Sequence, residues 1–185
     1  MYQKAYDRRA ALLYAQRWGR GRNPAYFDFT DLGGDCTNFI SQCVYAGSGV
    51  MNYTPTYGWY YIDAQDRTAS WTGVEYFYNF MTANDGAGPH MTEVPVSQIR
   101  PGDVIQLGRR DGSFYHSLLV TRTGFYPSVN NIYITTHSFD AYMRRLNTYE
   151  AEAMRFLHVD YVNVPEPVSP PPRPGRPAPP APYGA

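Results

Sequence analysis

The stretch Gly33–Gln42, GGDCTNFISQ, decides how this 185-residue chain is expected to fold. Its two glycines predict a tight turn, and the residues after them predict a helix with Cys36 in its first turn. A helix N-terminus has unpaired backbone N–H groups and a partial positive charge, which favour the nucleophilic thiolate form of cysteine. Cys36 is therefore a candidate nucleophile, and a buried structural cysteine is the alternative. Asp35 is expected to cap this helix.

A second motif, Arg100–Leu107, reads RPGDVIQL, which is a Pro-Gly turn followed by a short apolar strand. A polar hairpin follows it, and another apolar strand begins near His116. A histidine at a strand start beside a hairpin can point into a cleft, although a packed strand histidine is the alternative. Cys36 and His116 lie 80 positions apart, so only the fold can bring them together.

The expected elements place helices before strands. Apolar spacing predicts a helix over about 6–18, and the Cys36 helix is expected to end near Ala46. Thr72–Glu75 fits a capping box at the start of a third helix, with Trp71 as its hydrophobic staple. Strands are expected near 103–107, 115–121, 132–136 and 155–162. This order predicts an α+β fold with segregated layers and an antiparallel meander.

Composition narrows the function classes. The 16 basic and 16 acidic residues give a net charge of zero, which argues against electrostatic capture of nucleic acid or of an acidic membrane. No apolar run approaches about 18 residues, so no membrane span is expected. No signal peptide is visible, so a cytoplasmic location is the default expectation, and export or release stays open as the alternative. The spacing of the histidines and cysteines matches no metal motif, and we expect neither a metal nor another cofactor.

Cys36 and Cys43 are about two helical turns apart, roughly 10 Å, which is too far for a disulfide between them. Cys43 is expected in the core. From Pro165 on the composition changes, since ten of the last 21 residues are proline. We therefore expect a globular domain over 1–164 and a polyproline II or disordered tail over 165–185. The tail is interpreted as a spacer, with a Pro-binding partner as the alternative.

Taken in order, these motifs resemble the bacterial family called "Putative amidase domain", which is similar in outline to the NlpC/P60 and CHAP groups of papain-like cysteine hydrolases. The pieces that carry the resemblance span about residues 2–160 and are Tyr6–Ala11 with Tyr14 and Ala15, Arg22–Tyr26, Gly34–Cys43, Ser70–Thr72, Gly102–Gln106, His116–Ser117 and Thr136–Asp140. The resemblance implies a papain-like fold with the nucleophile at a helix N-terminus. It also implies attack by Cys36 on an amide carbonyl, with His116 as base.

A third residue is expected to orient His116. His137 and Asp140 both lie at the end of the next expected strand. NlpC/P60 proteins often use a second histidine at this place, which favours His137. Asp140 is chemically the stronger orienting group, so both residues stay open.

Four residues are candidates for substrate binding. Asn38 and Gln42 lie one turn apart on the Cys36 helix, where a helix-surface amide pair is the alternative. Trp59 lies in the long aromatic segment 50–69, which is expected to form a wall of a cleft, and Trp71 follows this segment. The resemblance implies a peptide or other amide substrate, and the related groups suggest peptides derived from peptidoglycan.

The predicted function is therefore a cysteine amidase or peptidase. An acyltransferase would use the same two side chains, so the sequence does not separate these reactions. A non-catalytic binding module with an aromatic groove is the alternative from another class.

Overall fold

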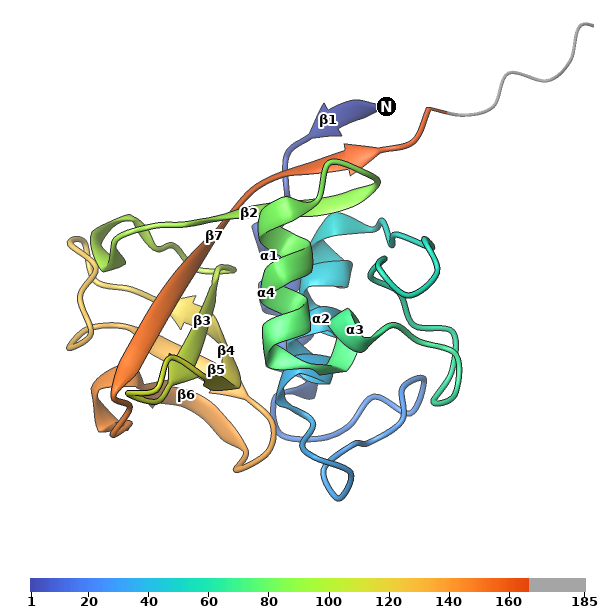
Figure 1. The fold of residues 1–185 in the computed structure, drawn as a ribbon. Coiled ribbons are helices and arrows are strands. Elements are labelled where there is room, and N and C mark those ends of the chain that lie inside the picture. The colour runs from blue at the N-terminus through green and yellow to red at the C-terminus, as the bar shows by residue number, and fades with distance from the viewer. Residues whose placement is uncertain (167–185) are drawn as a thin grey trace, which may run out of the picture.

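The computed structural model describes residues 1–166, in which helices pack on one antiparallel sheet (Figure 1). The helices are α1 (Arg8–Trp18), α2 (Cys36–Ser48), α3 (Ala69–Thr72) and α4 (Val74–Ala83). The strands are β1 (Tyr2–Lys4), β2 (Gly88–Glu93), β3 (Val104–Gly108), β4 (Phe114–Arg122), β5 (Tyr133–Thr136), β6 (Ala141–Arg145) and β7 (Ala153–Val164). Short 3-10 helices cover Val96–Gln98 and Leu146–Thr148. The mixed helix and antiparallel-sheet composition confirms the coarse fold class.

The sheet has the order β1-β7-β3-β4-β5-β6, and β2 pairs with β7 beyond this path. Strands β3, β4 and β5 follow one another as the predicted meander, which continues into β6, a strand that was not expected. The fourth expected strand, β7, pairs with β3 and not with β5. Strand β7 then returns along β3 and continues past it to pair with both β1 and β2, as the long orange strand in Figure 1 shows. The last strand therefore ties the two ends of the described chain to the centre of the sheet.

Both predicted N-terminal helices are present. α1 begins after Asp7, whose carboxylate accepts a hydrogen bond of 2.9 Å from the Ala10 N–H. α2 ends at Gly49, which has a left-handed φ of 63° that glycine adopts without a steric penalty.

The predicted capping box at Thr72–Glu75 is wrong. Residues 69–72 form the separate short helix α3, and Gly73 precedes α4 without any side-chain cap. The Glu75 carboxylate instead accepts a hydrogen bond from the Phe114 N–H at 2.8 Å and pairs with Arg155. The Glu75 side chain therefore makes tertiary contacts instead of capping the start of the helix, as the local pattern had predicted.

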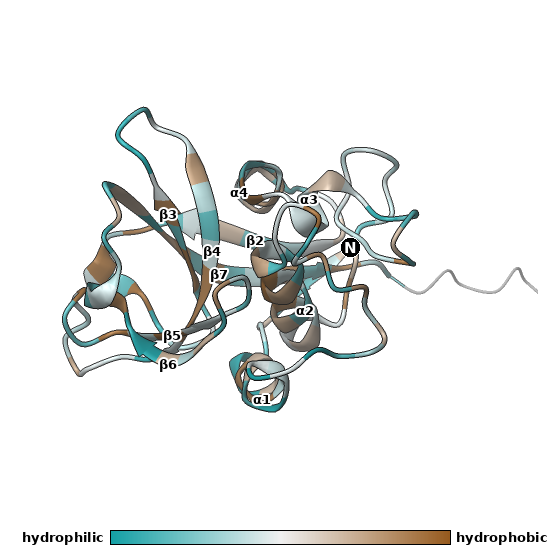
Figure 2. Ribbon diagram, turned by 90° about the horizontal axis from the view of Figure 1, so that it is seen from below, coloured by the Kyte–Doolittle hydropathy of each residue, from teal (hydrophilic) through white to brown (hydrophobic). Residues whose placement is uncertain are grey.

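Apolar side chains form two clusters on opposite faces of the sheet. Val104 of β3 and Leu119 of β4 pack with the helices, whereas their neighbours Ile105 and Leu118 belong to the second cluster, as the alternation of a strand requires. Figure 2 shows α1, α2 and α4 gathered on one side of the strands. Eleven of the thirteen residues of α2 are buried, so this helix is held on several sides and its first residue, Cys36, has a fixed position.

Within residues 1–166 no helix is both long and apolar enough to cross a membrane. The predicted Pro-rich tail lies, from residue 167 on, outside the described residues. The division of the chain near 164 therefore stays a prediction.

Candidate active site

Cys36 and His116 line one cavity of about 700 Å³. Cys36 enters it from the first turn of α2, and His116 from β4, where it lies opposite Leu107 of β3. The fold thus brings together the two residues that the sequence separates by 80 positions. The remaining lining residues are Thr30, Gly33, Gly34, Leu107, Tyr115, Ser138, Phe139, Arg144 and Tyr149.

The turn before α2 requires glycine because of its backbone conformation. Gly33 and Gly34 have φ values of 97° and 111°, a region that residues with a side chain rarely adopt. A Cβ on Gly34 would lie 3.2 Å from Ser138 Oγ, so the turn also approaches the β5–β6 connection closely. The Asp35 N–H donates a hydrogen bond to this Ser138 hydroxyl. These contacts aim the start of α2 at the cavity.

Burial leaves both candidate catalytic groups neutral. It raises the pKa of the Cys36 thiol, and the nearby Asp35 carboxylate raises this pKa further, against the backbone amides of Ser117 and Thr37 and the Thr37 hydroxyl, which lower it. Burial, helped by Arg144, lowers the pKa of His116 to about 4. The direction of this pKa shift is opposite to the one expected from the helix N-terminus, because desolvation disfavours the charged thiolate.

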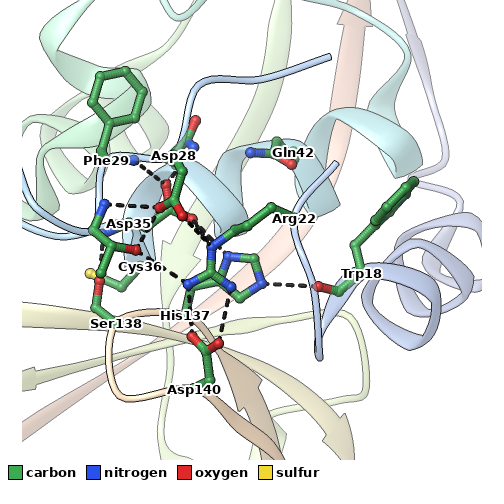
Figure 3. A network of polar contacts seen from close by, with 12 residues as sticks. Trp18, Arg22, Asp28, Phe29, Asp35, Cys36, Gln42, His137, Ser138 and Asp140 are labelled. Atoms are coloured by element: carbon green, nitrogen blue, oxygen red, sulfur yellow. Dashed lines mark hydrogen bonds and ion pairs between the residues drawn. The ribbon is translucent and has the colours of Figure 1, made fainter. Parts of the chain in front are cut away.

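Asp35 occupies the N-cap position of α2 but does not cap the helix with its side chain. Oδ1 accepts hydrogen bonds from the Phe29 N–H at 3.0 Å and from Asn38 Nδ2 at 2.7 Å. Oδ2 lies 2.7 Å from His137 Nδ1 (Figure 3). The capping prediction is thus wrong, since this buried carboxylate joins the loop before α2 to the end of β5.

His137 does not orient His116. Its Nδ1 meets the Asp35 carboxylate, its Nε2 lies 3.0 Å from the carbonyl oxygen of Trp18, and its ring stacks on Phe39 with centroids 3.9 Å apart. Both partner atoms are oxygens, and together they occupy both ring nitrogens of His137. The sequence prediction fails because both ring nitrogens are occupied elsewhere.

Asp140 does not orient His116 either. Its carboxylate, about half exposed, forms a two-pronged ion pair with Arg22 at 3.0 and 2.9 Å (Figure 3). Arg22 Nε also lies 3.2 Å from Asp28 Oδ2. Within residues 1–166 no side chain forms a hydrogen bond with the His116 ring, so the described chain places Cys36 and His116 in the cavity without a third orienting residue.

The four predicted substrate-binding residues lie in the interior. Asn38 is used by Asp35 and by Trp71, whose Nε1 donates to Asn38 Oδ1 at 2.9 Å. Gln42 accepts a hydrogen bond of 2.6 Å from the Tyr14 hydroxyl. Trp59 and Trp71 are both 0% exposed and pack against each other in the core. These predictions are wrong, because α2 buries Asn38 and Gln42, the two tryptophans lie in the core beside it, and none of the four residues lines the cavity.

Three residues that the sequence analysis missed shape the cavity. Phe139 is 93% exposed and follows Ser138 in a turn where both residues have positive φ, 57° and 70°. Arg144 lies with its guanidinium 4.0 Å over the Tyr149 ring. The Tyr149 hydroxyl is buried and has no hydrogen-bond partner within the described residues. The turn that carries Phe139, strand β6 with Arg144 and the segment that ends at Tyr149 show no periodic apolar pattern that would have predicted these roles.

Comparison with known proteins identifies the family of this chain. Residues 5–159 match the family described as "Putative amidase domain", and the chain belongs to this family. The family's description agrees at a coarse level with the predicted amide hydrolysis. The similarity to NlpC/P60 and CHAP proteins stays a prediction.

One relative is the protein YhbB of Bacillus subtilis (strain 168), which is described as uncharacterized. It is 35% identical over 144 residues, which cover 75% of this chain and 43% of YhbB. The chain thus spans less than half the length of this relative. No solved structure matches the chain.

Proposed function

We propose that this protein hydrolyses amide bonds with Cys36 as nucleophile and His116 as base. The observation that carries the proposal is that these two side chains line one cavity, with Cys36 at the start of a long, buried helix. Membership of the amidase family supports the class of reaction.

The proposed reaction begins from a neutral thiol and a neutral imidazole, the forms that burial of both groups favours. His116 takes the thiol proton as the sulfur attacks the amide carbonyl, so that a C–S bond forms and the carbonyl oxygen gains the negative charge. Collapse of this intermediate breaks the C–N bond, and His116 returns the proton to the leaving amine. Water then hydrolyses the thioester and releases the acid and the free thiol.

Backbone N–H groups in the first turn of α2, including that of Cys36, are the proposed donors to the developing oxyanion, since a helix N-terminus presents such groups to an anion. The arrangement of a cysteine on this turn and a histidine on an adjacent antiparallel strand is the basis for proposing a papain-like fold.

The cavity suggests the type of substrate. Arg144 supplies a permanent positive charge, and no carboxylate of residues 1–166 lines the cavity. Leu107, Phe139 and two tyrosines supply apolar surface. We propose a peptide amide that carries an apolar group and a carboxylate, and peptides from the bacterial cell wall fit this description.

The test is hydrolysis of a panel of short peptide amides, each offered with a free and with an amidated C-terminus. Cys36→Ser is expected to lower kcat/KM by at least about a thousandfold, because the hydroxyl is a poorer nucleophile beside the same base. Cys43→Ala is the matched control, since this buried cysteine lies in the core and not in the cavity.

Full activity of Cys36→Ser on a substrate that the wild-type protein cleaves would overturn the proposed mechanism. A preference for the free C-terminus supports the substrate class. Equal cleavage of both forms would overturn the role given to Arg144.

A further inference from the structure

A buried row of polar side chains, which we call the donor chain, runs through the sheet to the sulfur of Cys36. In order, its members are Arg155 on β7, Gln106 on β3, Ser117 on β4 and Thr37 on α2. The successive distances are 2.7 Å from Arg155 Nε to Gln106 Oε1, 3.1 Å from Gln106 Nε2 to Ser117 Oγ, 3.0 Å from Ser117 Oγ to Thr37 Oγ1, and 3.8 Å from Thr37 Oγ1 to Cys36 Sγ. Gln106, Ser117 and Thr37 are all 0% exposed.

The first member of the donor chain has only donors to offer. The Arg155 guanidinium lies between the rings of Tyr78, 3.6 Å from its centroid, and Phe114, at 3.9 Å. It also pairs with Glu75 at 2.9 Å. Arginine has no acceptor, so the atom of Gln106 that faces Arg155 Nε is the amide oxygen.

The direction of every later hydrogen bond follows from this start. The two hydrogens on Gln106 Nε2 go to the Val74 carbonyl at 3.0 Å and to Ser117 Oγ. Ser117 therefore accepts from Gln106 and donates its single hydrogen to Thr37, which is its other polar side-chain neighbour in the described chain. Thr37 accepts that bond, so its own hydrogen is free to point at Cys36 Sγ. The reverse direction would leave the Ser117 hydrogen buried without a partner.

We propose that the donor chain positions the Cys36 sulfur and stabilises the thiolate that forms when His116 takes its proton. This inference rests on the proposed function of Cys36. A thiolate accepts hydrogen bonds more strongly than a thiol, so the Thr37 contact strengthens as the charge develops. The head-to-tail order of the donors favours negative charge at the sulfur, and Arg155 fixes that order. Thr37 and the members behind it are positioning residues.

Other charged or titratable groups also face Cys36. His116 and Tyr115 on β4, Arg144 on β6, and Tyr149 line the same cavity, and Asp35 precedes Cys36 in the chain. A substitution of Thr37 leaves all of them in place. A change in the thiol pKa of such a variant therefore reports the donor chain.

The experiment measures the Cys36 thiol pKa in the full chain from the pH dependence of alkylation by iodoacetamide, read for each cysteine by mass spectrometry. Thr37→Val, which keeps the shape of the side chain, is expected to raise this pKa by about one unit, because it removes a hydrogen bond that is stronger to the charged thiolate than to the thiol. Thr37→Ser restores the hydroxyl and is expected to restore the pKa. Thr121→Val is the matched control. Thr121 lies on the same strand as Ser117, but its hydroxyl donates to the Tyr133 carbonyl and takes no part in the donor chain.

Equal thiol pKa values in Thr37→Val and Thr121→Val would overturn the proposal. If Thr37→Val does not fold, Ser117→Ala takes its place, with a smaller rise expected because the terminal hydroxyl stays, and no rise would overturn it. The outcome is separate from that of the proposed function. If Thr37→Val raises the thiol pKa but Cys36→Ser is fully active, the donor chain is supported and the catalytic role of Cys36 is overturned. If Thr37→Val leaves the thiol pKa unchanged but Cys36→Ser is inactive, the catalytic role is supported and the donor chain is overturned.

Discussion

His116 shows how burial sets the chemistry of one side chain. Its pKa falls from an ordinary 6.5 to about 4 in the folded protein. Between these two pH values the unfolded chain binds more protons than the folded one, so stability is present above pH 6.5 and is lost as the pH falls toward 4. The full difference corresponds to about 3 kcal/mol.

Urea unfolding measured from pH 7 to pH 4 checks this prediction. His116→Gln removes the titrating group, so the difference in unfolding free energy between the wild-type protein and this variant is expected to shift in favour of the variant as the pH falls. Parallel curves over this range would contradict the burial of a neutral imidazole.

At this scale the sequence predicted the two cavity residues and misplaced most of the others. Cys36 was predictable because a glycine turn and a helix start are local signals. Asn38, Trp71 and His137 were not, because Trp71 bonds to Asn38 and His137 to Asp35 across distant parts of the sequence, and no local pattern predicts these pairs. These three candidate site residues are therefore buried and make hydrogen bonds that hold parts of the fold together.

At the scale of elements, α2 depends on a close approach at Gly47. A Cβ there would lie 2.3 Å from Tyr6 Cε2 and 2.8 Å from the Asp7 carbonyl oxygen. Gly47→Ala is expected to destabilise the protein by about 1–3 kcal/mol through overpacking, in spite of the better helix propensity of alanine. Thermal unfolding measures the loss.

Gly21→Ala is the matched control, because nothing lies within 4 Å of a Cβ at Gly21. Similar melting temperatures for the two variants would show that α2 adjusts to the added methyl group.

Helices and strands with a strong local pattern were predicted well. α1, α2, β3, β4, β5 and β7 lie within a few residues of their expected positions. The short strands β1, β2 and β6 were missed, because β1 is wholly exposed, β6 is mostly exposed and β2 begins with Gly-Pro. Their pairing comes from neighbouring strands and not from their own apolar alternation.

At the scale of the whole molecule, Asp103 joins the N-terminal and C-terminal parts of the described chain. This fully buried carboxylate on the turn before β3 pairs with Arg8 of α1 at 2.6 Å. It also accepts from the Val159 N–H of β7 at 3.0 Å and lies 2.8 Å from His158 Nδ1. The Pro-Gly-Asp turn was visible in the sequence, but these partners were not.

Asp103→Asn is expected to lower the free energy of unfolding by about 3 kcal/mol, because removing one partner of a buried ion pair leaves the other charge uncompensated. Equilibrium urea unfolding measures this loss as one transition at lower denaturant concentration. Asp160→Asn on β7 is the control, since its carboxylate is partly exposed, pairs with His90 at 3.0 Å, and is expected to cost under about 1 kcal/mol. Equal losses would show that the Asp103 pairs do not hold the two parts together.

The turn that carries Ser138 and Phe139 combines an unfavourable backbone conformation with two side chains that the structure uses. Left-handed backbone at a residue with a side chain costs on the order of 1 kcal/mol or more, and glycine or asparagine at both positions would remove most of that cost. Yet glycine at 138 would delete the hydroxyl that receives the Asp35 N–H, and glycine at 139 would delete the aromatic ring at the mouth of the cavity. At these two positions, the residue that would make the backbone most stable is therefore not the residue that supplies the hydroxyl and the aromatic ring.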